Sequence, residues 1–193
     1  MKKTVLSTLL ATAIAMPAFA VTLTPEQVPE PKRFEAQHYL LPQEVYDIKT
    51  KNDANTLLVD IRTIPELHFV GYAPIIDANI PYLNYDYSSW DDKTKEYKRN
   101  FNSSFVGQVE DLLAKKGMAG KKDANIILMC RSGDRSARAA DLMAKSGYTN
   151  VWSAIEGFEG DKSKEGTRSV NGWKNANLPW TYSLNKEKAA FTD

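Results

Sequence analysis

The sequence contains a single cysteine, Cys130, and two histidines among its 193 residues. One cysteine cannot form an intramolecular disulfide, which excludes a disulfide-stabilised scaffold. There is also no Cys-x-x-Cys pair and no second thiol to resolve a mixed disulfide, so a disulfide-exchange activity is disfavoured. The cysteine is therefore either a small buried apolar residue or a reactive thiol.

An excess of either charge is also missing, because 25 Lys and Arg residues stand against 24 Asp and Glu residues. A near-neutral chain with mixed signs argues against nucleic-acid binding as its main function. After residue 20 no hydrophobic segment is long enough to cross a bilayer, and there is no internal repeat, low-complexity tract or inter-domain linker. These absences leave one globular domain without a stable membrane anchor.

The first 20 residues have the three parts of a secretory signal peptide. A positive start, Met1-Lys2-Lys3, precedes an apolar stretch from Val5 to Ala15 and the small-residue end Ala18-Phe19-Ala20. The apolar stretch is too short for a lasting transmembrane anchor. We therefore expect cleavage after Ala20, export, and a periplasmic location. The mature chain would keep 173 residues with 23 basic and 24 acidic side chains, a net charge of −1.

Apolar periodicity in the rest of the chain predicts strands that alternate with helices. Short buried strands are expected at residues 56–60, 75–80, 125–129 and 150–155. Helices are expected from Pro42, from Pro65 to Val70, over 105–116 and over 136–145. Such alternation predicts an α/β fold, with a mostly parallel central sheet and helices on both faces.

The regular elements set the expected boundaries of the domain. Residues 1–20 are the signal peptide, 21–36 an extended N-terminal lead-in, 37–182 the domain, and 183–193 a C-terminal tail. Residues 82–102 are polar, charged and aromatic without a clear period, which indicates a surface excursion between core elements.

The residues around Cys130 favour a reactive thiol over a buried apolar cysteine. An apolar run over 125–129 leads into Cys130-Arg131-Ser132-Gly133-Asp134-Arg135, and the predicted helix follows at Ser136. Backbone N–H groups of such a turn and the positive end of the helix dipole favour a thiolate and bind small oxyanions. The two arginines add positive charge. The sequence therefore predicts a reactive thiol in an anion-binding loop.

Two charged residues stand at the end of the strand predicted at 56–60: Asp60 is its last residue, and Arg62 follows two positions later. Because open α/β sheets bind ligands beyond the carboxyl ends of their strands, both are expected near Cys130. An ion pair between them that fixes the loop is favoured over direct contact with a substrate.

With these residues in view, the chain resembles the rhodanese (sulfurtransferase) family in its single-domain form. Leu57 to Arg62, followed by Pro65-Glu66-Leu67, is similar to that family's leading strand and Asp-x-Arg signature. Gly71 to Tyr82 resembles its second signature, although Tyr72 stands where His is usual. Residues 130–136 resemble its active-site loop, and the closing segment is similar at Glu156-Gly157-Phe158, Trp173 and Leu178-Pro179.

The resemblance implies a single rhodanese-like domain that transfers sulfur without a cofactor or metal. Cys130 would attack the outer sulfur of a small anionic donor such as thiosulfate and become a persulfide. The sulfur would then pass to a thiol or cyanide, and the physiological acceptor, a small thiol or a protein, stays open. Backbone N–H groups over 131–136 would hold the persulfide or the departing sulfite.

The resemblance also assigns roles to the loop side chains. Arg131 and Arg135 would attract the donor, and Ser132 and Ser136 would add hydroxyl hydrogen bonds. Gly133 would let the loop curl without a Cβ clash. Asp134 opposes ionisation of a neighbouring thiol, so it is expected to face solvent or an arginine.

The nearest rival function is that of a cysteine-based phosphatase or arsenate reductase. Those enzymes place five residues between cysteine and arginine and often a histidine before the cysteine, whereas here four residues separate Cys130 from Arg135 and Met129 precedes. The tighter loop favours sulfur over phosphate. A second alternative is a persulfide carrier or binding module that docks a partner protein, with residues 85–97 as the candidate surface.

Two further readings are disfavoured. His38 and His68 are isolated in the sequence, and a persulfide mechanism needs no base. Residues 161–166 echo the first half of a calcium loop, but Gly172 occupies the twelfth position, where such loops have Glu. A polar turn is the preferred interpretation, and no metal site is expected.

Overall fold

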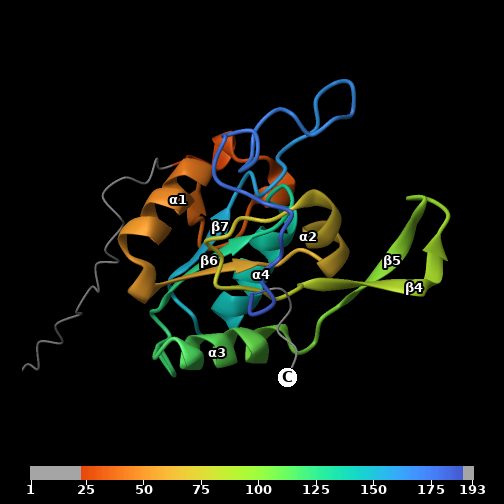
Figure 1. Cartoon of the computed structure of the whole chain (residues 1–193). Helices are drawn as coiled ribbons and strands as arrows, with labels where there is room; N and C mark the ends of the chain where they lie inside the picture. The colour runs from red at the N-terminus through yellow and green to blue at the C-terminus, as the bar shows by residue number, and fades with distance from the viewer. Residues whose placement is uncertain (1–22, 189–193) are drawn as a thin grey trace, which may run out of the picture.

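The computed structural model describes residues 23–188, so the predicted signal peptide lies outside the described residues. The centre of the domain is a five-stranded parallel sheet with the order β1-β7-β6-β2-β3 (Figure 1). Its strands are β1 (Tyr39–Leu40), β2 (Thr56–Asp60), β3 (Ala78–Asn79), β6 (Asn125–Met129) and β7 (Val151–Ala154). β2 and β6 stay in register up to the pair Asp60–Met129, so their carboxyl ends lie at the same edge of the sheet.

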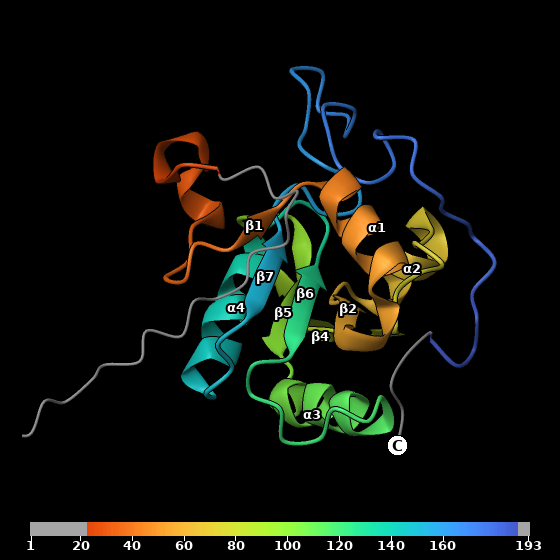
Figure 2. The same cartoon turned by 90° about the vertical axis from the view of Figure 1, so that its left-hand side faces the viewer.

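Helices cover both faces of this sheet, as predicted. They are α1 (Pro42–Lys51), α2 (Ile64–Val70), α3 (Phe105–Lys115) and α4 (Asp134–Lys145). Figure 2 shows α1 and α2 on one side of the strands and α4 on the other. Alternate residues of β6 divide between the two layers: Ile126 and Leu128 pack with α3 and α4, whereas Ile127 and Met129 pack with α1 and α2. Each such buried side chain stabilises the fold by roughly 1.5–3 kcal/mol.

Three predicted boundaries need correction. The strand expected at 75–80 is reduced to the two residues of β3, because a turn precedes it and Asp77 uses its side chain to bind neighbouring elements. Helix α4 begins at Asp134, two residues earlier than predicted, since Gly133 adopts a left-handed conformation and caps it. The lead-in predicted as extended contains two short 3₁₀ helices, η1 (Pro25–Gln27) and η2 (Glu30–Lys32), around the buried Val28.

Two further elements were not predicted from the sequence. The two-residue strand β1 pairs with Ser153 and Ala154 of β7 at the edge of the sheet. A third 3₁₀ helix, η3 (Asp53–Asn55), leads directly into β2. Both are too short to produce a periodic pattern in the sequence. Within residues 23–188, no helix has the length and apolar character needed to span a membrane.

The surface excursion is an antiparallel hairpin of β4 (Leu83–Asp91) and β5 (Glu96–Phe101). Figure 1 shows that it projects from the body of the domain. Its register shifts between Asp86 and Trp90, where a bulge interrupts the alternation of side chains. This bulge explains why the sequence has no clear period here, and the predicted surface excursion is an ordered hairpin.

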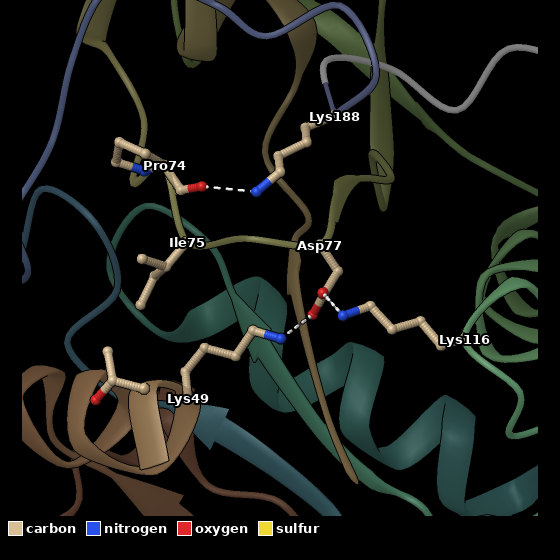
Figure 3. Close-up of a pocket in the computed structure, with 7 residues that line it drawn as sticks. Lys49, Pro74, Ile75, Asp77, Lys116 and Lys188 are labelled. Carbon is tan, nitrogen blue, oxygen red and sulfur yellow. Dashed lines mark hydrogen bonds and ion pairs between the residues drawn. The ribbon is translucent and has the colours of Figure 1, made fainter. Parts of the chain in front are cut away.

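A buried carboxylate, Asp77, ties several elements together beside the middle of β2 (Figure 3). Its Oδ2 accepts a hydrogen bond from Leu58 N at 2.7 Å and lies 2.7 Å from Lys49 Nζ of α1. Its Oδ1 pairs with Lys116, which caps α3. Lys49 also donates to the carbonyl of Thr56 at the start of β2. These contacts hold α1 and the end of α3 against the sheet.

Candidate active site

The predicted cysteine loop lies between the carboxyl end of β6 and the first turn of α4. Cys130 Sγ accepts a hydrogen bond from the backbone N–H of Gly133 at 3.1 Å, and the Ser136 hydroxyl lies 3.6 Å away. The cysteine is only 1% exposed and sits at the base of a cavity of about 160 Å³. The described residues that line this cavity are Leu83, Arg99, Cys130, Arg131, Ser132, Asp134, Arg135 and Arg138.

Glycine is required at two positions that shape this loop. Gly133 has φ +102°, and a side chain there would collide with the carbonyl of Ile155. Gly157 has φ +64°, and an added Cβ would lie 2.5 Å from the carbonyl oxygen of Cys130. The loop can therefore curl over the end of β7 only while both positions lack a side chain.

The segment after β7 supports the loop from behind through backbone hydrogen bonds. Phe158 N donates to Cys130 O at 2.8 Å, and Glu159 N donates to Arg131 O at 3.0 Å. Trp173 N in turn donates to Gly157 O at 2.9 Å. The closing segment recognised in the sequence is thus the direct support of the cysteine loop.

A chain of hydroxyl groups lies beneath the thiol. Ser136 Oγ donates to Gly133 O at 2.9 Å and accepts a hydrogen bond from Ser153 Oγ at 2.9 Å. Ser136 and Ser153 are fully buried. Ser136 therefore holds the curled loop as well as facing the sulfur.

Arg135 forms a buried ion pair with Glu66 of α2. Its Nη1 and Nη2 lie 2.8 and 2.5 Å from the two carboxylate oxygens. Burial alone would raise the pKa of Glu66, but Arg135 and the hydrogen bonds from Thr63 lower it from 4.5 to about 2. Arg135 also lines the cavity, so its contact with the donor stays a prediction, and Glu66 fixes the position of its guanidinium.

Asp60 and Arg62 form the ion pair that the sequence favoured. Arg62 Nη2 lies 2.7 Å from Asp60 Oδ2, and both side chains are fully buried. The same nitrogen donates to Gly71 O at 2.9 Å, and the guanidinium stacks 4.0 Å from the centre of the Phe158 ring. Since Phe158 binds the carbonyl of Cys130, the pair supports the loop from the side away from the cavity.

Comparison with known proteins agrees with this geometry. Residues 41–164 match the rhodanese-like domain. The chain belongs to the rhodanese-like family. An uncharacterized protein of Rickettsia conorii is 32% identical over 139 residues, covering 72% of this chain and 93% of the relative. An uncharacterized protein of Rickettsia prowazekii is 31% identical over 153 residues, covering 74% and 100%.

A solved structure shares the rhodanese-like fold. The crystal structure of Rv0390 from M. tuberculosis has a TM-score of 0.56 and 23% identity, covering 75% of this chain and 97% of that chain. The match therefore confirms the α/β fold with its mostly parallel sheet, and it says nothing beyond the fold.

Three functional residues of this rhodanese-like site were missed in the sequence. Glu66 was assigned to the start of a helix and to the first family signature but not to the site, although its spacing from Thr63 is that of a capping box. Arg138 lines the cavity one helical turn after Arg135, a spacing of three that the sequence displays. Arg99 of β5 also lines the cavity, and no local pattern places it there.

The remaining predicted loop residues, Arg131, Ser132 and Asp134, line the open part of the cavity and are partly exposed. Asp134 is thus turned toward the cavity mouth, in the first turn of α4. His38 stacks on Trp152 at 4.7 Å and His68 packs against Phe69, and the described residues of the cavity wall include neither.

The segment that echoes a calcium loop is bound to the domain by side-chain contacts. Asp161 pairs with the buried Lys32 at 2.8 Å and accepts a hydrogen bond from Asn171. These contacts describe a polar turn, which agrees with the preferred interpretation of the sequence.

Proposed function

We propose that this rhodanese-like protein is a sulfurtransferase that carries sulfane sulfur as a persulfide on Cys130. The rhodanese-like fold supports sulfurtransferase-type activity in general. The observation that carries the proposal is the position of Cys130 Sγ, 3.1 Å from a backbone N–H donor at the base of an arginine-lined cavity. Such a donor stabilises a thiolate, and afterwards the anionic sulfur of a persulfide.

The first half-reaction takes a small anionic donor such as thiosulfate. The Cys130 thiolate attacks the outer sulfur, a new S–S bond forms to Sγ, and the old S–S bond breaks. Sulfite leaves with the electron pair of that bond. Arg131 and Arg138 line the cavity, and their positive charge favours both an anionic donor and the anionic sulfite that leaves.

The second half-reaction returns the enzyme to its thiolate form. An acceptor, either cyanide or the thiolate of another molecule, attacks the outer sulfur of the persulfide. The bond between the two sulfurs breaks, and Cys130 leaves as the thiolate. No net oxidation occurs over the cycle, and no general base is needed at neutral pH if both sulfurs react as anions.

The loop geometry also supports sulfur over phosphate as the cargo. Gly133 N points at the sulfur itself, and the arginine that closes the loop, Arg135, is bound to Glu66. The loop also has four residues between Cys130 and Arg135, one fewer than a cysteine-based phosphatase loop, which supports the smaller cargo.

We further propose that the protein acts after export, in the periplasm, because its N-terminal sequence has the parts of a signal peptide. N-terminal sequencing of the mature protein, with Val21 expected first, tests this.

Intact-mass measurement tests the persulfide directly. The purified protein is reduced, incubated with thiosulfate and desalted, and it should gain the mass of one sulfur atom. Cyanide should remove that mass and yield thiocyanate. A Cys130→Ser variant prepared in parallel should gain nothing. If the wild-type protein gains no sulfur, or if the variant gains as much as the wild type, the proposal is wrong.

A further inference from the structure

The β4–β5 hairpin has one aromatic face and one polar face. Ring centroids lie 5.8 Å apart for Tyr85–Tyr87, 5.4 Å for Tyr87–Tyr97 and 5.2 Å for Trp90–Tyr97, so the four rings form one row. We call Tyr85, Tyr87, Trp90 and Tyr97 the aromatic face. On the other side, the pair Asp86–Lys98 and its neighbours form a polar surface.

The aromatic face is largely in solvent. Tyr87 is 63% exposed, Trp90 49% and Tyr97 44%. The base of the hairpin is anchored, since Phe101 packs on Tyr82, which packs on Phe105 of α3. Tyr and Trp side chains in a row on an anchored arm are the residue types that dominate binding energy at protein interfaces.

This face continues into the wall of the Cys130 cavity. Tyr85 lies opposite Arg99 in the hairpin register, and Leu83 lies two residues before Tyr85 on the same side of the strand. Both Leu83 and Arg99 line the cavity. A nine-residue strand extends about 30 Å, far more than a small sulfur anion can contact. The surface leading to the thiol is therefore sized for a polypeptide.

We propose that the aromatic face docks a protein acceptor that presents a cysteine flanked by acidic residues to the Cys130 persulfide. The inference rests on the sulfurtransferase function proposed above and names its acceptor. We expect the partner to be acidic because it must complement the positive charge around the cavity. Arg131 and Arg138 line the cavity, and Asp134 is the only acid among its described lining residues. Arg99 lines it as well, and its pair with Glu96 is exposed and 3.6 Å long, so it neutralises little of the arginine's charge. The paired Arg135 is already neutralised by Glu66.

A second copy of this chain fits the same face poorly. A stable dimer across the aromatic face would cover the entrance to the cavity, because Leu83 and Arg99, which line the cavity, lie beside Tyr85 on the same side of the hairpin. It would also bring two sets of arginines together, which costs free energy through like-charge repulsion. A transient partner avoids both problems, since it leaves once sulfur has been transferred.

The transfer step is the second half-reaction with a protein thiol as acceptor. The partner's thiolate attacks the outer sulfur of the Cys130 persulfide, and a new S–S bond forms on the partner. The S–S bond to Cys130 Sγ breaks with its electron pair, so Cys130 returns to the thiolate. The partner leaves as a persulfide, and no other reactant is consumed.

Two synthetic peptides of equal length test the docking. Each contains one cysteine and the same apolar residues, and the cysteine is flanked by glutamates in one and by lysines in the other. Wild-type protein is loaded with thiosulfate and desalted, and the rate of sulfur transfer to each peptide is measured by mass spectrometry. We expect the acidic peptide to accept sulfur at least about tenfold faster at low salt, and the advantage to fall as salt screens the charges.

Variants of the hairpin test whether its residues cause the preference for the acidic peptide. Arg99→Gln should reduce the acidic-to-basic rate ratio several-fold, whereas Lys98→Gln, the same charge change on the polar face, should leave that ratio as it is. A Tyr87→Ser/Trp90→Ser double variant should lower the ratio of peptide transfer to cyanide transfer. Because these side chains are exposed, circular dichroism should show an unchanged fold.

Three outcomes would overturn the docking proposal. The two peptides could accept sulfur equally fast, the double variant could match the wild type, or light scattering could show a dimer that the double variant converts to a monomer. The first two leave persulfide formation and cyanide transfer intact, so the proposed sulfurtransferase function survives them. If no persulfide forms at all, both proposals fail together.

Discussion

Arg135 of α4 donates two hydrogen bonds to Glu66 of α2, across 69 positions of the chain. The pair joins the helix that follows Cys130 to the helix that follows Arg62, and its two side chains are 8% and 10% exposed. Glu66 also accepts hydrogen bonds from the backbone and side chain of Thr63, at 2.9 and 2.8 Å. One carboxylate thus caps α2 and fixes the start of α4.

Removing the charge of Glu66 should destabilise the domain strongly. Glu66→Gln leaves Arg135 buried without a counter-ion, and breaking a buried pair in this way costs about 3–5 kcal/mol. Urea unfolding measures the change in free energy. Asp92→Asn is the control, because its pair with Lys95 is exposed and spans 3.8 Å, so the loss should stay below about 1 kcal/mol. Equal losses in the two variants would contradict the structural role of Glu66.

The same carboxylate should make stability depend on acid pH. The pKa of Glu66 is lowered from 4.5 to about 2 in the folded protein, so its contribution is full above pH 4.5 and is lost as pH falls toward 2. Urea midpoints measured from pH 6 to pH 2 should therefore fall more steeply for the wild type than for Glu66→Gln. Parallel curves would show that Glu66 does not titrate as the ion pair requires.

Gly133→Ala should abolish the working geometry of the loop. The new side chain would meet the carbonyl of Ile155, and φ +102° is disfavoured for alanine. Displacing the N–H that binds Cys130 Sγ should slow persulfide formation on the order of a hundredfold. Gly117→Ala is the control: φ is +71° there, but nothing lies within 4 Å of the added Cβ. Intact-mass time courses with thiosulfate compare the two, and equal rates would refute the role of Gly133.

Asp77→Asn should destabilise the fold without changing the chemistry. Lys49 is 2% exposed and would lose its 2.7 Å ion pair with the Asp77 carboxylate, so the expected loss is about 3–5 kcal/mol. A Lys49→Met/Asp77→Asn double variant should recover part of it, since no buried ammonium remains. Thermal unfolding measures the loss. Because the described lining of the Cys130 cavity does not include Asp77, folded protein should form persulfide at the wild-type rate.

Much of the candidate site could be predicted because its parts are contiguous in the sequence. The apolar run 125–129, the loop from Cys130 and the helix after Gly133 together specify a thiol at a helix N-terminus. Each of these signals acts over a few residues: β-branched side chains favour the strand, and a glycine with positive φ begins the helix. The sequence alone therefore located Cys130 and the fold class that holds it.

Contacts between distant residues could not be read in this way. Arg135 pairs with Glu66 because α2 and α4 meet at one edge of the sheet, and no local pattern encodes that meeting. Arg99 reaches the cavity only because the hairpin is anchored at Tyr82. The sequence by itself placed Cys130, the candidate thiol, between a strand and a helix, through local backbone preferences. The tertiary structure decided which arginines line the cavity and which carboxylates lie beside them, Glu66 beside Arg135 and Glu96 beside Arg99, because both depend on how distant segments pack together.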